Sequence, residues 1–160
     1  MNIFVLDKCP IKAAQYQCDK HVVKMILETA QLLCSVYPNG EAPYKRTHYN
    51  HPCAIWTRES WANYYWLYKH GIALGNEYTY RYNKIHKSID AIIWCWENIS
   101  RNNFQLLHTV NEHDPITFPK CMPDEYKVDD IVQSYRNYYK GAKRDIAKWT
   151  KRPVPNWFNE

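Results

Sequence analysis

The chain has 160 residues, of which 46% are hydrophobic and 16% aromatic, and a formal net charge of +5. This length suits one domain with a real hydrophobic core. The modest positive charge favours anionic partners but is too small for a surface that coats nucleic acid. No apolar run approaches the roughly 20 residues of a membrane span, and the run after Met1 is too short for a signal peptide.

The six cysteines contain no C-x-x-C pair of the kind that binds zinc or serves in redox chemistry. Those in predicted helices suit a role as small apolar residues with free thiols. We therefore expect reduced thiols, no bound metal, no cofactor and no membrane partner in a cytosolic protein.

The first half of the chain predicts one extended segment followed by two long helices. Residues 2–6, NIFVL, form a short strand or an extended segment, and a mostly buried helix runs from residue 10 to residue 37. A second helix is capped by Asn50 and continues to residue 82. Gly71 and Gly75 lie four residues apart in it, so they either weaken it or let another helix approach closely.

The second half predicts two shorter helices around a long connection. Ser88 caps a helix that ends near residue 99, and residues 102–128 form a long ordered loop. Asp130 and Gln133 resemble a capping box that opens a helix over residues 131–149. The extended tail is anchored by Trp157 and Phe158. The sequence thus predicts a mainly α protein, with residues 1–160 in a single compact helical domain.

The first long helix carries an unusual row of polar side chains. His21, Lys24, Glu28 and Gln31 fall on one narrow face, and Gln17 extends this row backwards. Buried charges need partners, because desolvation costs several kcal/mol for each ion. An internal salt bridge between Lys24 and Glu28 would satisfy part of the row. We favour the alternative, in which the row lines a polar cleft and a ligand completes the bonding.

A second cluster lies where the next helix begins. Lys45, His48, Asn50 and His51 precede or open this helix, and a helix N-terminus attracts phosphate. Two histidines with a carboxylate would instead suit a metal. Histidines that cap backbone groups are the third interpretation.

Basic and aromatic residues alternate in two further segments. Arg81, Lys84, His86 and Lys87 stand among tyrosines and suit phosphate binding and base stacking. The second of these segments contains Lys120, Tyr126, Arg136 and Tyr139, most of which fit a solvated helix face. Together the clusters predict one pocket for an anionic, aromatic ligand, which is either a nucleotide or a nucleic-acid strand. No phosphate-binding loop of a kinase or motor protein is present.

Several segments resemble a family of small bacteriophage proteins. They are CDKHVVKMILETAQLL, THYNHPCAIW, RYNKIHKS, MPDEYK and SYRNYYKGAKRDIAKWTKR. More distantly, the order of elements resembles the phage pyrimidine-dimer DNA glycosylases. In those proteins a short N-terminal segment precedes a first helix that carries the catalytic glutamate, and the resemblance implies the same helical fold.

The resemblance also implies an active site at the start of the chain. Those glycosylases use the N-terminal amine that removal of the initiator methionine exposes, with a small residue following. Here Asn2 follows Met1, and a bulkier second residue usually leaves the methionine in place. The catalytic glutamate would fall near His21, where the nearest acids in the row are Asp19 and Glu28.

Two functions follow from these observations. In the first, a phage protein sequesters a host immune nucleotide signal, of the cyclic nucleotide or cyclic ADP-ribose type, as a counter-defence in the cytoplasm of the infected bacterium. In the second, the protein is an enzyme on nucleic acid or nucleotides, either a DNA glycosylase or lyase or a phosphodiesterase, and His21, Glu28, His48 and His51 are the catalytic candidates. Both functions are compatible with a homo-oligomer. The expected ligand-binding residues are Gln17, Lys20, His21, Lys24, Glu28, Lys45, His48, Asn50, His51, Arg81, Lys84, His86, Lys87 and Tyr126.

Overall fold

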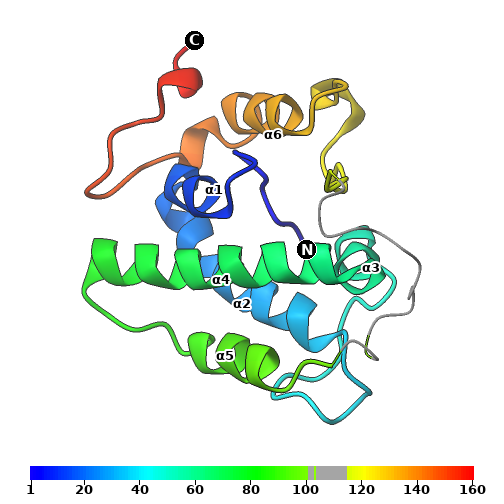
Figure 1. Ribbon diagram of the computed structural model, residues 1–160. Helices are drawn as coiled ribbons and strands as arrows, with labels where there is room; N and C mark the ends of the chain where they lie inside the picture. The colour runs from blue at the N-terminus through cyan, green and yellow to red at the C-terminus, as the bar shows by residue number, and fades with distance from the viewer. Residues whose placement is uncertain (101–102, 104–114) are drawn as a thin grey trace.

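The computed structural model describes residues 1–100, 103 and 115–160, and their regular structure is helical (Figure 1). The mainly α class is therefore confirmed. The helices are α1 (Pro10–Tyr16), α2 (Asp19–Cys34), α3 (Pro52–Glu59), α4 (Trp61–Tyr82), α5 (Ile89–Glu97) and α6 (Ile131–Lys140), with short 3-10 turns at Asp124–Tyr126, Arg144–Ile146 and Asn156–Phe158. Among the described helices, none has the length and apolarity that crossing a membrane requires.

The predicted single helix over residues 10–37 is wrong, because the chain divides it into α1 and α2. Gln17 and Cys18 are extended at the break, with ψ angles of 138° and 162°. The Gln17 side chain donates a hydrogen bond to the Ile3 carbonyl (3.0 Å), so a distant segment stabilises the break. Periodicity within the helix carries no information about this partner. α2 also ends at Cys34, before the predicted end.

The helix predicted from Asn50 to residue 82 is likewise divided, into α3 and α4. Ser60 is extended between them, and its side chain accepts a hydrogen bond from the Asn63 amide, which starts α4 afresh. The cap of α3 is His51 rather than Asn50, since the His51 ring accepts a hydrogen bond from the Cys53 amide (3.1 Å). α4, with 22 residues, is the longest described helix.

The later elements follow the predictions in part. Asp130 caps α6 by accepting a hydrogen bond from the Gln133 amide (2.7 Å), but α6 ends at Lys140 rather than at residue 149. Trp157 and Phe158 are buried, as expected of an anchored tail. Of the predicted loop over 102–128, residues 102 and 104–114 lie outside the described residues.

α4 forms the axis of the packing. It contacts α1, α2, α3 and α5, and α2 also packs against α5 (Figure 1). A Cβ atom at Gly71 would lie 2.9 Å from Thr29 Cγ2 of α2 and 3.0 Å from Ile92 Cδ1 of α5. The glycine therefore permits the close helix approach that the sequence raised as one of two interpretations.

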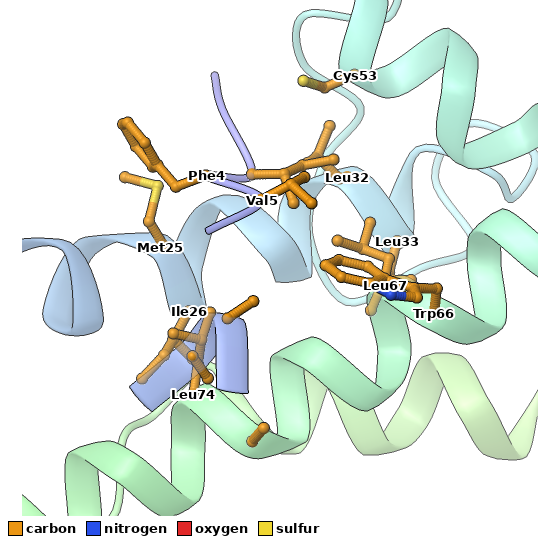
Figure 2. Close-up of a cluster of buried hydrophobic side chains, with 14 of the residues drawn as sticks. Phe4, Val5, Met25, Ile26, Leu32, Leu33, Cys53, Trp66, Leu67 and Leu74 are labelled. Atoms are coloured by element: carbon orange, nitrogen blue, oxygen red, sulfur yellow. The ribbon is translucent and has the colours of Figure 1, made fainter. Parts of the chain in front are cut away.

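The N-terminal segment lies inside this core. Val22, Ile26 and Leu33 of α2 are fully buried, as predicted. Figure 2 shows Phe4 and Val5 beside Met25 and Leu32 of α2, with Leu67 and Leu74 of α4 in the same cluster. Burial of residues 3–6 holds the chain start against α2, and Figure 1 shows the N-terminus next to α3.

Candidate active site

The start of the chain meets a glutamate of α2. The Asn2 backbone N–H donates a hydrogen bond to Glu28 Oε2 at 3.2 Å. The Asn2 side chain is held on both of its polar atoms: Nδ2 donates to the Cys121 carbonyl (2.7 Å), and Oδ1 accepts from the Tyr135 hydroxyl (2.9 Å). Three parts of the chain thus fix the position of one nitrogen beside a half-buried carboxylate.

His51, Cys53 and Cys121 lie in the same neighbourhood. Burial lowers the pKa of His51, and the positive N-terminal amine and His48 lower it further, whereas Glu28 acts in the opposite direction. The hydrogen bond from Cys53 lowers the pKa of Cys121 to about 7, aided by the N-terminal amine. The ligand atoms of His51, Cys53 and Cys121 lie within 4.8 Å of one another, and Asn2 joins this group to Glu28 through its bonds to the Cys121 carbonyl and the Glu28 carboxylate.

His21 occupies a different environment. It is buried, its ring stacks on Phe4 with 4.1 Å between centroids, and its Nδ1 lies 2.5 Å from the Tyr139 hydroxyl. Burial lowers the pKa of His21 to about 3, and the positive charges of Lys143 and Lys24 contribute. The imidazole is therefore neutral near pH 7, with a proton on one of its two ring nitrogens.

Other predicted site residues have partners inside the protein. The Gln17 side chain bonds to Ile3 and to His70, and both ring nitrogens of His86 are occupied by backbone groups. Arg81 is buried and bonds through three nitrogens to Glu77, Asp19 and the Gln15 carbonyl. The structure gives these residues stabilising contacts at the positions where the sequence predicted ligand binding.

The remaining predicted residues lie at or near the surface. Tyr126 is half-buried, and its ring lies 5.4 Å from that of Tyr138. Lys120 and Arg136 donate hydrogen bonds to backbone carbonyls. The exposed members of the predicted set are Lys20, Lys24, Lys45, His48, Asn50, Lys84 and Lys87.

The expected single pocket is not built from these segments. His51 caps α3, and Figure 1 shows α3 beside the start of α4, whereas Arg81 lies in the last turn of α4 and Lys84 and Lys87 follow it. α4, with 22 residues, is roughly 33 Å long at 1.5 Å per residue, so the two groups belong to opposite ends of this helix. A hollow of about 480 Å³ exists between α1 and α4, but no predicted site residue lines it.

Sequence reasoning missed Asn2, Cys53 and Cys121 as members of the site. Asn2 and Cys121 are 119 residues apart, and their contact comes from the path of the chain rather than from a spacing. The signal that could have found Asn2 was the glycosylase resemblance, which directs attention to the first amine. Nothing in the spacing marks Cys121.

The protein is helical, residues 3–6 are buried, and the backbone nitrogen of Asn2 is hydrogen-bonded to Glu28. This arrangement is typical of a site that pairs a nitrogen near the N-terminus with a carboxylate. The profile of the pyrimidine dimer DNA glycosylase family matches residues 1–90 of this chain, a range that includes Asn2, Glu28 and His51. The chain therefore belongs to the pyrimidine dimer DNA glycosylase family. No curated protein and no solved structure shows a significant match.

Proposed function

We propose that this protein is a DNA glycosylase that uses an N-terminal amine as nucleophile and Glu28 as acid and base. One observation carries the proposal: the nitrogen of residue 2 lies 3.2 Å from Glu28 Oε2. This separation is within the reach expected of an activated nucleophile and its base. The family name makes a pyrimidine dimer in DNA the first substrate to test.

These two groups and one proton from solvent water balance the chemistry. The amine lone pair attacks C1′ of the deoxyribose, the bond between C1′ and the base breaks, and the base leaves with the electron pair and takes up a proton from solvent water. Glu28 accepts a proton from the attacking nitrogen and then returns it to the ring oxygen as the sugar opens. The product is an iminium ion that links the chain start to C1′.

The reacting nitrogen is that of Asn2, because it is the one bonded to Glu28. In a chain that keeps Met1, this nitrogen belongs to a peptide bond and is not nucleophilic. The proposal therefore requires removal of Met1, contrary to the expectation from the size of Asn2. The mass of the intact purified protein shows whether the chain begins at Met1 or at Asn2.

Cations around the site suit the DNA backbone. Lys24 is exposed on α2, and Lys143 Nζ lies 4.9 Å from the centre of the Tyr138 ring and 6.0 Å from that of Phe4. Both lysines lower the pKa of His21, so both lie close to the same part of α2. Lysines near an active site neutralise the phosphates that flank an extruded base.

The test is covalent trapping on ultraviolet-irradiated duplex DNA with borohydride, which reduces an imine to a stable bond. We expect a cross-linked complex from a chain that begins at Asn2 and none from a chain with an added glycine before Asn2. Base release is measured as cleavage of the bond between the base and C1′, because the freed base of a pyrimidine dimer stays joined to its partner base. Glu28→Gln should lose it, whereas Gln31→Ala, one turn further along α2, should keep it. Absence of both base release and cross-linking in the chain that begins at Asn2 would contradict the proposal.

Neither the geometry nor the comparison with known families supports the sequestration of an immune nucleotide, because the basic segments needed for one pocket are separated along α4. A phage origin, a location in the host cytoplasm and a homo-oligomer stay predictions. Retention of an intact nucleotide by the purified protein, without base release from DNA, would restore the sequestration hypothesis.

A further inference from the structure

Three side chains of the metal-binding kind converge beside the N-terminus. The possible ligand atoms of His51, Cys53 and Cys121 all lie within 4.8 Å of one another. The two sulfur atoms are 3.5 Å apart. We propose that His51, Cys53 and Cys121 bind a zinc ion.

The spacing matches the geometry that zinc imposes. Bonds of about 2.3 Å to sulfur and about 2.0 Å to nitrogen, arranged tetrahedrally, place two sulfurs roughly 3.8 Å apart and a sulfur and a nitrogen roughly 3.5 Å apart. The observed separation of the sulfurs therefore needs a change of only a few tenths of an ångström. Thiolate and imidazole are also the donor set that selects zinc over magnesium or calcium.

The surrounding hydrogen bonds orient the ligands. His51 Nδ1 accepts a hydrogen bond from the Cys53 amide (3.1 Å), so the neutral ring carries its proton on Nε2. Nδ1 holds the free lone pair and is the atom that would bind zinc, in place of this hydrogen bond. The Cys121 amide donates to the Tyr135 hydroxyl (3.3 Å), and the Cys121 carbonyl accepts from Asn2. Such second contacts fix ring and backbone orientation in metal sites.

A second cysteine pair shows that close sulfurs alone are not the argument. Cys34 and Cys95 are also 3.5 Å apart, but the described residues add no third ligand to them. His51 distinguishes the Cys53–Cys121 pair.

A zinc ion here would join the start of α3 to the segment around Cys121. Three protein ligands leave a fourth tetrahedral position, as in zinc sites that bind water or a substrate oxygen. Asn2 connects the two sites, because its backbone N–H donates to Glu28 and its side chain donates to the Cys121 carbonyl. The ion would therefore lie at the edge of the proposed active site and would hold that edge together.

The experiment measures the metal content of the full-length protein, purified under reducing conditions after expression with added zinc. We expect about one zinc per chain, as for a single site with three protein ligands. Cys121→Ser should lose the zinc, whereas Cys9→Ser, a change at an exposed cysteine, should keep it. Equal zinc in Cys121→Ser and the parent, or none in the parent, would overturn the proposal.

A measurement on the unaltered protein guards against variants that fail to fold. A chelator should lower the Tm of the zinc-loaded protein, and added zinc should restore it. The alternative to a zinc site is a disulfide between Cys53 and Cys121, which peptide mapping without reductant detects. Such a disulfide in metal-free protein would overturn the zinc assignment. Zinc content is read independently of base release, so an inactive protein with bound zinc would contradict only the proposed function.

Discussion

The Glu77 carboxylate accepts two hydrogen bonds from the Arg152 guanidinium, at 2.8 and 3.0 Å, across 75 residues of sequence. Arg81 bonds to the same carboxylate at 2.9 Å and to Asp19 at 3.0 Å. Glu77 and Arg81 are both buried. This network ties α4 to the start of α2 and to the C-terminal segment, and it accounts for a cation that the sequence suggested as a phosphate ligand.

Glu77→Gln should destabilise the protein. Removing the acid leaves the Arg81 charge buried beside fewer partners, and loss of one member of a buried pair typically costs about 3–5 kcal/mol. Urea unfolding measures the change. Arg152→Gln is the control, because the Arg152 side chain is partly exposed and its loss should cost clearly less. Equal stability of Glu77→Gln and the parent would contradict the role given to the network.

Lys24 and Lys84 provide a matched pair for the DNA-binding surface. Both are exposed lysines, but Lys24 lies one turn from Glu28 on α2, and Lys84 lies in the segment that follows α4. Lys24→Ala should weaken binding to duplex DNA and reduce the salt dependence of the affinity by about one unit of slope. Lys84→Ala should leave both quantities unchanged. Fluorescence anisotropy over a salt series checks this, and a larger effect of Lys84 would assign the DNA-binding surface to the segment that follows α4.

Buried histidines should make stability depend on pH. Burial lowers the pKa of His21 to about 3 and that of His70 to about 4, against about 6.5 for an unfolded chain. Between these values the unfolded state binds protons that the folded state does not, so stability rises with pH. It should be complete above about pH 6.5 and decline on acidification towards pH 3–4.

The free energy of unfolding at a series of pH values tests the histidine prediction. His21→Gln should reduce the slope below pH 6.5, and Asn50→Ala, a change at an exposed position without a titrating group, should leave it unchanged. A neutral His21 is also a poor proton donor near pH 7, so His21→Gln should not remove a titrating group from the pH profile of base release. A profile that loses one limb in this variant would show that His21 exchanges a proton.

Gly71→Ala should lower stability by about 1–3 kcal/mol, because the new methyl group meets Thr29 and Ile92 where three helices approach. Thermal unfolding measures this change. Asn76→Ala, at an exposed position of α4, is the control and should be neutral or slightly stabilising, since alanine favours a helix. Unchanged stability in Gly71→Ala would mean that the helices can separate without cost.

Much of the architecture follows from local pattern in the sequence. Apolar spacing predicts the buried face of α2, Asp130 predicts the start of α6, and the aromatic residues of the tail predict that it packs against the rest of the protein. These features depend on residues within a few positions of one another, because helix periodicity and capping are local interactions. The sequence failed at Gln17 and Ser60, where an otherwise helical pattern is interrupted; at Gln17 the partner lies on a distant segment.

The site divides in the same way. Sequence alone placed Glu28 on a polar face, brought His48 and His51 to the start of a helix, and through the family resemblance pointed to the first amine. Only the tertiary structure put the nitrogen of Asn2 on Glu28 and Cys121 beside Cys53, and only it enclosed Arg81 among carboxylates. A side chain's charge and spacing state what it can bind, but the partner that it meets depends on chain segments far away in sequence.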